Sequence, residues 1–337
     1  MLRVAAFTGG KNVPSARFRV RQYIGRLTGE GVEVTEFAAP MGVYPPANKL
    51  MRPLWGIATL ATRLPGIMQS YRYDLTLLQR EMLSTFVTLE NLTKRPRVLD
   101  VDDAIWLHRG GKFAERLAQQ CDGVICGNAF LAEQFSRWNS RVTIIPTAVD
   151  TNRYFQEQPV EAPVIGWSGT SGGFRYLYSI EPALVAVFER IPDAMLRIVS
   201  DAMPSFQKIP ASRIEFIRWS PENEVQAIQG MAVGIMPLED SLWERGKCSF
   251  KMLTYMACGV PVVVSPVGMN VEVLSHGHIG FGAQTIDDWV DILLSLLADM
   301  RQRIEMGENG RQVLLDNYSL NVVAPKLAET LLQYARA

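Results

Sequence analysis

The sequence contains few of the residues from which metal sites and disulfide frameworks are built. Its 337 residues include four cysteines and three histidines. The cysteines form no CxxC or other metal-ligand spacing, and their neighbours are apolar or small: Cys121, Cys126, Cys248 and Cys258. They are typical of reduced thiols in a cytosolic protein. His276 and His278 have a spacing that can bind metal, but no cysteine or aspartate pattern accompanies them. A surface loop is therefore favoured, and no metal site is predicted.

Neither sign of charge is in excess, and no long hydrophobic run is present. Lysine plus arginine number 34, as do aspartate plus glutamate. This balance argues against broad nucleic-acid binding, although it leaves room for a local cationic pocket. The closest approach to a membrane span, residues 50–68, is interrupted by two arginines and two prolines. No signal peptide is apparent at the start of the chain. We therefore expect a soluble, cytoplasmic protein.

Short apolar runs alternate with longer amphipathic stretches, as in βα units that build a parallel sheet. Helices are expected between the runs, for example over 15–29 and over 129–138 behind Asn128 as the N-cap. The runs predicted as strands are 2–7, 32–37, 75–78, 97–101, 123–126, 142–145, 164–168, 195–199, 214–217, 233–236 and 262–265.

The polar segment 147–162 interrupts this rhythm and is predicted to be a linker. The pattern restarts after it, so the fold class is α/β, with two doubly wound domains over 1–155 and 156–319. The amphipathic helix of about 320–337 can pack back on the first domain. Ligands of such sheets bind beyond the carboxyl ends of the strands.

The segment 246–261 carries most of the functional argument. A loop of glycine, serine and two lysines leads into a short helix, with Gly259 as the expected C-cap, and Pro261 leads into a buried strand. A helix N-terminus binds anions, and the ammonium groups of Lys247 and Lys251 would suit a diphosphate. These residues alone are equally compatible with an ordinary loop–helix–strand unit whose lysines are solvated.

This segment, together with 233–238 and 265–272, resembles the donor-binding signature of retaining glycosyltransferases of family 4. The resemblance implies the GT-B fold, in which two Rossmann-like domains face a central cleft. It also implies transfer of a sugar from a UDP- or GDP-sugar to the hydroxyl of a carbohydrate or lipid-linked acceptor. Retention of configuration and a role in bacterial polysaccharide or glycoconjugate synthesis follow from it too.

The resemblance also suggests how the donor is held. Lys247, the helix N-terminus and Lys251 would stabilise charge on the leaving diphosphate, so no metal or other cofactor is expected. The glycine turn after residue 168 would face the donor, and the turn after residue 8 would lie over its phosphates. The donor-binding residues implied in this way are Gly9, Gly10, Ser168, Gly169, Thr170, Asp240, Lys247, Cys248, Ser249, Phe250, Lys251 and Thr254.

The sequence departs from the family pattern at two positions. Many members carry two glutamates eight positions apart, which here fall at Gly246 and Thr254. Thr254 can offer one hydroxyl hydrogen bond to a ribose. The missing glutamates keep open a nucleotide-sugar-binding subunit without catalysis. A GT-B nucleotide-sugar epimerase is a further alternative, although its acid/base chemistry is poorly served by so few histidines.

Three aspartates lie at the end of the strand-like run 97–101 or directly after it: Asp100, Asp102 and Asp103. They are expected at the functional edge of the first sheet. These aspartates could form the metal-binding DxD motif of glycosyltransferases with a single nucleotide-binding domain, but the tandem organisation argues against that fold. They could also form the Asp-x-Asp-x-Thr/Val motif of dehalogenase-type phosphatases, but the last position of that motif is Ala104 here. The motif resembles the aspartate-rich motif of one branch of the family, in which Asp102 or Asp103 would orient or deprotonate the acceptor hydroxyl. Helix-capping aspartates are an equally supported interpretation.

Two further features carry open alternatives. Arg17 and Arg21 lie at i and i+4, so they either bind an acceptor phosphate or form a solvated face. The segment 50–68 has one helical stripe of apolar residues, Leu54, Ile57, Ala58, Ala61 and Leu64. We favour a helix that packs on its own sheet. The alternative is a helix that docks on an anionic bilayer surface.

Overall fold

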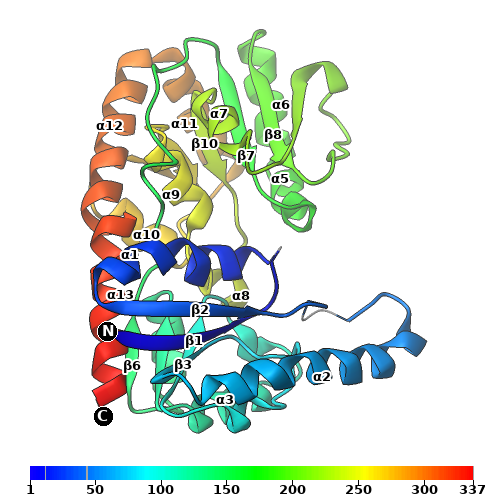
Figure 1. Ribbon diagram of the computed structural model, residues 1–337. Helices are drawn as coiled ribbons and strands as arrows, with labels where there is room; N and C mark the ends of the chain where they lie inside the picture. The colour runs from blue at the N-terminus through cyan, green and yellow to red at the C-terminus, as the bar shows by residue number, and fades with distance from the viewer. Residues whose placement is uncertain (12, 43–44, 337) are drawn as a thin grey trace. The chain divides into compact units, whose positions relative to one another are not determined.

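The computed structural model describes residues 1–11, 13–42 and 45–336, and the chain forms two compact units (Figure 1). The first unit comprises Met1–Ala148, Arg245–Cys248 and Leu320–Ala337. The second comprises Val149–Glu244 and Ser249–Ser319. Each unit has its own parallel six-stranded sheet and its own hydrophobic core.

The sheet of the first unit has the strand order β2-β1-β3-β4-β5-β6. Side chains along its inner strands are buried without alternation, as in a parallel sheet covered by helices on both faces. The strands are β1 (Leu2–Thr8), β2 (Val32–Ala38), β3 (Leu75–Gln79), β4 (Arg97–Val101), β5 (Gly123–Cys126) and β6 (Val142–Ile144).

Helices cover both faces of this sheet. On one face α13 buries Tyr334, whose hydroxyl donates to the carbonyl of Arg141, and a Cβ at Gly123 would collide with its ring. The helices are η1 (Ala16–Val20, a π-helix), η2 (Arg21–Tyr23), α1 (Ile24–Gly29), η3 (Lys49–Met51), α2 (Arg52–Ser70), η4 (Glu90–Leu92), η5 (Ile105–Leu107), α3 (Lys112–Gln120), α4 (Ala129–Phe135) and α13 (Leu320–Arg336).

The sheet of the second unit has the order β12-β11-β10-β7-β8-β9. Its strands are β7 (Val164–Ser168), β8 (Met195–Ser200), β9 (Ile214–Arg218), β10 (Val233–Met236), β11 (Val262–Val264) and β12 (Gly280–Gly282). The helices along this part of the chain are η6 (Ser171–Gly173), α5 (Phe174–Ser179), α6 (Glu181–Arg190), η7 (Ala211–Arg213), α7 (Glu224–Gln229), α8 (Leu242–Arg245), α9 (Phe250–Ala257), α10 (Met269–Leu274), α11 (Ile286–Ala298) and α12 (Met300–Asn317).

The predicted fold class of two doubly wound α/β sheets is confirmed, and each predicted strand is present with its ends within one residue of the expected position. Sequence reasoning missed β12, whose three residues Gly-Phe-Gly lack a strand pattern. This strand exists because Val262–Val264 offers it a parallel edge, with Val263 opposite Phe281.

The division between the units falls between Ala148 and Val149, inside the predicted linker 147–162, and the predicted domain boundary between residues 155 and 156 lies further along the chain. The backbone N–H of Val149 donates to Tyr318, and the hydroxyl of Tyr154 donates to the carboxylate of Glu224 at 2.7 Å. These bonds attach the start of the predicted linker to the second unit. The short excursion Arg245–Cys248, which belongs to the first unit, had no signal in the sequence pattern.

Helix α2 packs on its own sheet, but through the face opposite to the predicted one. Leu54, Ile57 and Leu64 are exposed, whereas Arg63 and Gly66 are buried. The apolar stripe was therefore wrongly taken as the packing face. Two interactions set the observed orientation. The guanidinium of Arg63 donates to carbonyl oxygens at the ends of β1 and β2, and Gly66 lets the helix approach aromatic rings of both strands.

Candidate functional site

The carboxyl edge of the first sheet gathers a cluster of charged side chains around Asp103. Its Oδ2 lies 3.3 Å from Nη1 of Arg80, and its Oδ1 lies 3.4 Å from Nζ of Lys247. Arg80 directly follows β3 and adopts a left-handed backbone with φ of 63°. Its N–H donates to the carbonyl of Asp100, which holds this turn against β4. Asp103 is thus bound by two cations from distant parts of the chain.

Asp102, its neighbour, has a different environment. Its Oδ1 is fully buried and has no hydrogen-bond partner among the described residues. Burial, followed by the adjacent charge of Asp103, raises the pKa of Asp102 to about 7. A carboxyl group that titrates near neutral pH is suited to take up and release a proton. The two aspartates therefore differ in chemistry, since one is paired with cations and the other is poised to exchange a proton.

Asp100, the third aspartate of the motif, has a structural role. Its carboxylate accepts two hydrogen bonds from Arg19, at 2.5 Å from Nη2 and 3.1 Å from Nε. Arg19 also donates to the carbonyl of Ile145 at 2.8 Å, and both charged side chains are almost fully buried. This ion pair ties the π-helix Ala16–Val20 to the end of β4 and so fixes the strand end from which Asp102 and Asp103 follow.

The excursion Arg245–Cys248 brings Lys247 to this edge. The side-chain amide of Asn128 donates to the carbonyls of Arg245 at 3.3 Å and Lys247 at 3.0 Å. Its oxygen accepts from the N–H of Leu131, so the predicted N-cap of α4 is confirmed. One short side chain therefore starts a helix and holds the lysine loop in place.

Gly246 has no room for a side chain in this loop. A Cβ at Gly246 would lie 2.8 Å from the backbone nitrogen of Ala104 and 2.8 Å from its Cβ. Gly127 is closed in a similar way by the sulfur of Cys248, which also lies 3.4 Å from the carbonyl oxygen of Asp102. The first glutamate expected from the family pattern is thus excluded by close packing of this loop on the residues after β4.

The glycines and arginines near the N-terminus have specific local roles. Gly10 has φ of 136°, which favours glycine, and it follows the end of β1 together with Gly9. Arg21 donates two hydrogen bonds to the carboxylate of Glu36, from Nε at 2.8 Å and from Nη2 at 2.7 Å. The guanidinium of Arg17 stacks over the ring of Phe18 at 4.8 Å. Arg21 is therefore held by a carboxylate, and acceptor binding by the two arginines stays a prediction.

In the second unit, Lys251 lies against the glycine turn that follows β7. Its Nζ lies 5.4 Å from the ring centroid of Trp167, and its Cε would lie 2.5 Å from a Cβ placed on Gly169. The N–H of Ser168 donates to the hydroxyl of Tyr255 at 2.8 Å, so α9 fixes the end of β7. A cation, the turn Ser168–Gly169–Thr170 and a helix N-terminus thus come together in one unit.

Other predicted donor residues are engaged within the fold. The hydroxyl of Ser249 donates to Oδ1 of Asn270 at 2.7 Å, and Ser249 is buried with φ of 50°. The hydroxyl of Thr254 donates to the carbonyl of Lys251 at 2.8 Å. Phe250 begins α9, and Asp240 is exposed in the loop after β10. Cys248 is a buried residue of the first unit. Donor binding by these residues stays a prediction.

Sequence reasoning missed Arg80, the carboxylate of Glu244 and the hydrogen bonds by which Asn128 holds the lysine loop. Arg80 had a usable signal, because it is the first charged residue after the strand predicted over 75–78. Glu244 is buried and accepts hydrogen bonds from Tyr176, Arg175 and the hydroxyl of Ser241. Its position in a polar run gave no sign of burial, which arises from Arg175 and Tyr176 in α5 and from Ser241, three positions before it.

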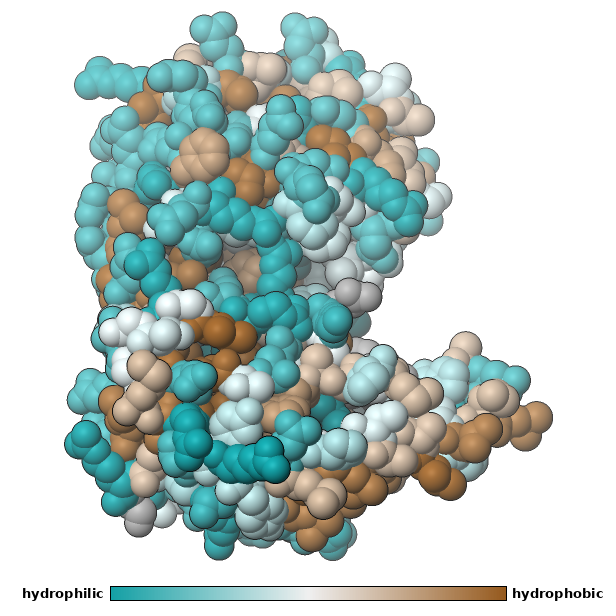
Figure 2. All heavy atoms as spheres, in the orientation of Figure 1, coloured by the Kyte–Doolittle hydropathy of each residue, from teal (hydrophilic) through white to brown (hydrophobic). Residues whose placement is uncertain are grey.

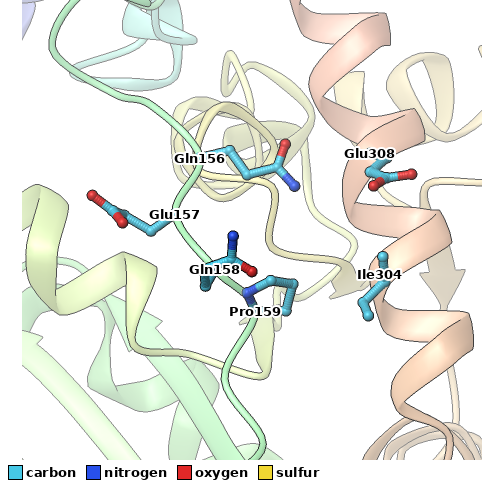
Figure 3. A pocket seen from close by; sticks show the side chains of 6 residues that line it. All are labelled: Gln156, Glu157, Gln158, Pro159, Ile304 and Glu308. Carbon is cyan, nitrogen blue, oxygen red and sulfur yellow. The ribbon is translucent and has the colours of Figure 1, made fainter.

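A separate pocket of about 440 Å³ lies in the second unit (Figure 3). It is bounded by the segment before β7 and by α12, through Gln156, Glu157, Gln158, Pro159, Ile304 and Glu308. Two carboxylates and no cation line it, so it is poorly suited to a phosphate. Within the described parts of the chain, no three His, Cys, Asp or Glu side chains are grouped to hold a metal ion.

Known proteins resemble this chain in fold and, over part of its length, in sequence. Sucrose-phosphate synthase from Thermosynechococcus elongatus superposes with a TM-score of 0.75 over 100% of both chains at 16% identity. WaaG, a glycosyltransferase involved in lipopolysaccharide biosynthesis, gives 0.68 over 97% of this chain and 99% of WaaG at 13% identity. The chain has the GT-B fold. Anabaena HepE in complex with UDP and glucose has the same TM-score of 0.68 at 15% identity, over 99% of this chain and 100% of HepE.

A family match lies within the second unit of this GT-B protein. Residues 163–299 match the family described as glycosyl transferases group 1. A GDP-mannose-dependent alpha-(1-6)-phosphatidylinositol monomannoside mannosyltransferase of Mycolicibacterium smegmatis is 32% identical over 166 residues, 44% of this chain and 42% of that protein. A D-inositol 3-phosphate glycosyltransferase of Corynebacterium glutamicum is 24% identical over 283 residues, 77% of this chain and 63% of that protein. The chain spans between two fifths and two thirds of the length of these relatives.

Proposed function

We propose that this protein is a glycosyltransferase that moves a sugar from a nucleotide-diphosphate donor to an acceptor hydroxyl. The observation that carries the proposal is the charged edge of the first sheet. There Asp102 has a fully buried Oδ1, while Asp103 is bound by Lys247 and Arg80. The group 1 match over 163–299 and the activities named for its relatives support the same reaction class.

The donor diphosphate is assigned to the second unit. Lys251 lies in the first turn of α9 and against the turn after β7, where its ammonium and the N-terminal N–H groups of α9 can share a phosphate. Lys247 is the second candidate cation, and its link to Asp103 holds its ammonium at the sheet edge. Cations that oppose the charge of a departing diphosphate act as the metal does in other transferases, so we propose metal independence.

Asp102 is assigned to the acceptor. In the reaction, the acceptor oxygen bonds to the anomeric carbon while the bond from that carbon to the diphosphate oxygen breaks. The hydroxyl proton passes to Asp102 or, on a same-face path, to the departing diphosphate. A carboxyl group that titrates near pH 7 suits the first route. Retention of configuration is proposed from the family resemblance.

The donor nucleotide and the acceptor define narrower proposals. One relative is named as GDP-mannose-dependent, and HepE was solved with UDP, so both GDP- and UDP-sugars are candidates. A carbohydrate or lipid-linked acceptor in bacterial polysaccharide or glycoconjugate synthesis accords with WaaG and with the phosphatidylinositol-directed relative.

A donor panel tests the proposal. The protein is incubated with UDP- and GDP-sugars, with candidate acceptors, and released nucleotide diphosphate and glycosylated product are measured. Release that needs an acceptor and is lost in Asp102→Asn and Lys251→Ala is the expected result. Donor binding by calorimetry without turnover would instead indicate a nucleotide-sugar-binding subunit. Interconversion of the donor sugar without transfer would indicate an epimerase.

The binding subunit has one specific observation in its favour. Neither position of the family glutamates offers a carboxylate here. Gly246 has no room for a side chain beside Ala104, and the hydroxyl of Thr254 donates to a carbonyl within α9. Glu244 offers a neighbouring carboxylate, but it is buried with three partners. We favour the enzyme because the subunit hypothesis assigns no role to Asp102, whose buried Oδ1 has no hydrogen-bond partner among the described residues.

A further inference from the structure

Helix α2 presents a continuous apolar surface to solvent. Leu54, Ile57 and Met68 are 63%, 69% and 76% exposed, and Leu50, just before the helix, is 90% exposed. Figure 1 shows the N-terminal half of α2 extending past the edge of the first sheet, and Figure 2 shows hydrophobic atoms along the same segment. We name this surface the α2 stripe: Leu50, Leu54, Ile57, Ala61, Leu64 and Met68.

The spacing of the α2 stripe places its members on one side of the helix. Successive members are four or three positions apart throughout, which keeps them within roughly 40° of one direction at 3.6 residues per turn. The buried residues of α2, such as Arg63 and Gly66, lie roughly 180° away. The stripe therefore points directly away from the sheet on which the helix packs, and folding of this unit does not cover it.

Polar contacts keep the stripe outward. The buried guanidinium of Arg63 donates to the carbonyls of Phe37 at 2.9 Å and Thr8 at 2.8 Å. A Cβ at Gly66 would lie 3.0 Å from the ring of Phe37. Turning the helix to bury its leucines would break these hydrogen bonds and force a larger residue onto that ring. The orientation is thus fixed by the fold, although it exposes apolar surface to water.

The charges around the stripe select its partner. No aspartate or glutamate occurs between Glu36 and Asp74, whereas Lys49 and Arg52 lie exposed at the N-terminal end of α2 and Arg72 lies exposed just after it. Tyr71 is also exposed beside Arg72. Two copies that paired through this surface would bring cations together without a countercharge. An anionic bilayer offers acyl chains to the leucines and headgroup phosphates to the cations.

We infer that the α2 stripe docks the protein on an anionic lipid bilayer surface, with α2 lying in the plane of the membrane. The helix has 19 residues and is thus roughly 28 Å long, and no helix of the described chain is long and apolar enough to cross a membrane. Contact is therefore peripheral. It deepens the proposed function by bringing lipid-linked acceptors within reach, but the docking itself does not depend on the chemistry.

Vesicle sedimentation tests the inference with the full chain. The probes are phosphatidylcholine vesicles with and without about 30% phosphatidylglycerol, at low and at high salt. We expect the wild-type protein to sediment with the anionic vesicles and to be partly released by salt. Leu54→Glu/Ile57→Glu is expected to lower the partition coefficient by more than about tenfold, since each buried leucine or isoleucine contributes to it. Lys49→Gln/Arg52→Gln is expected to lower it by several-fold on anionic vesicles alone.

A matched control and a second measurement keep the result decisive. Val271→Glu/Ile286→Glu adds the same charge at two exposed apolar residues of the second unit and should sediment like the wild type. Circular dichroism must show that all three double variants are folded. Equal sedimentation of wild type and Leu54→Glu/Ile57→Glu would overturn the inference. The inference would also be overturned if light scattering showed that the wild type is a dimer that does not bind vesicles, and that Leu54→Glu/Ile57→Glu is a monomer. Vesicle binding without sugar transfer would support the membrane-docking inference and contradict only the proposed function.

Discussion

The ammonium nitrogen of Lys247 lies 3.4 Å from Oδ1 of Asp103, although 144 positions separate the two residues in the sequence. Both side chains are about a quarter exposed, at 30% and 24%. Such a pair contributes little to stability, since water screens it. Its consequence is positional, because it holds a cation from the lysine loop beside the aspartates that end β4.

We expect Lys247→Ala to lower donor turnover about 100-fold, the effect of losing one fixed positive group at a leaving group. Lys247→Arg should retain much more activity, because it keeps the charge beside Asp103. The measurement is release of nucleotide diphosphate at saturating donor, together with the melting temperature, which should change little. Turnover within twofold of the wild type in Lys247→Ala would remove this lysine from the mechanism.

Asp102→Asn should abolish transfer to the acceptor while donor binding persists. A positioned general base contributes about 10²- to 10⁴-fold, and an amide cannot take up the proton. In the wild type, transfer should rise with pH through about 7, because burial raises the pKa of Asp102 to that value and only the ionised form accepts a proton. A flat pH profile from 5.5 to 8.5, or full activity of the variant, would argue against this role.

The same carboxyl group should affect stability in the opposite sense. The folded pKa of Asp102 lies above its unfolded value, so the folded state loses stability as pH rises from about 4 to about 7. Asp102→Asn should therefore raise the free energy of unfolding at pH 8 by roughly 1–3 kcal/mol, and with it the melting temperature. At pH 4 it should have little effect. Thermal denaturation of both proteins across this pH range measures the difference. The predicted direction would be contradicted if the stability of Asp102→Asn, relative to the wild type, were lower at pH 8 than at pH 4.

Arg19→Met should strongly destabilise the first unit, by about 3–5 kcal/mol, because it leaves the buried carboxylate of Asp100 without its partner. Combining it with Asp100→Asn should recover part of the loss. Arg3→Met is the matched control, since its pair with Asp74 is exposed and should cost less than about 1 kcal/mol. Urea unfolding followed by fluorescence measures all three. Equal losses for Arg19→Met and Arg3→Met would be inconsistent with a structural role of the buried pair.

Lys251→Ala should weaken donor binding about tenfold or more through loss of an ammonium at the turn after β7. Lys208→Ala removes an exposed lysine of the same unit and should leave binding unchanged. Calorimetric titration with UDP and GDP, in the absence of acceptor, isolates this step from catalysis. Unchanged binding in Lys251→Ala would assign the diphosphate to another site.

The sequence by itself determined the two parallel sheets and the edges at which chemistry is possible. Buried parallel strands are short apolar runs, so 97–101 and 164–168 were identified with their correct ends. The residue that follows such a run must lie at the carboxyl edge, which placed Asp102 correctly. Asn128 was likewise identified as a cap, because capping depends on the next few residues alone.

The tertiary structure alone decided which of these residues become partners. Three arginines are close together near the N-terminus, yet only Arg19 is buried, because Asp100 and Ile145 lie where its side chain ends. Lys247 joined the first unit because Asn128 holds its loop and Gly246 fits against Ala104. The α2 stripe faces solvent because the guanidinium of Arg63, on the opposite side of the helix, donates to carbonyl oxygens at the ends of β1 and β2. A periodic pattern defines the faces of a helix, but the face that is buried depends on contacts with residues far away in the sequence.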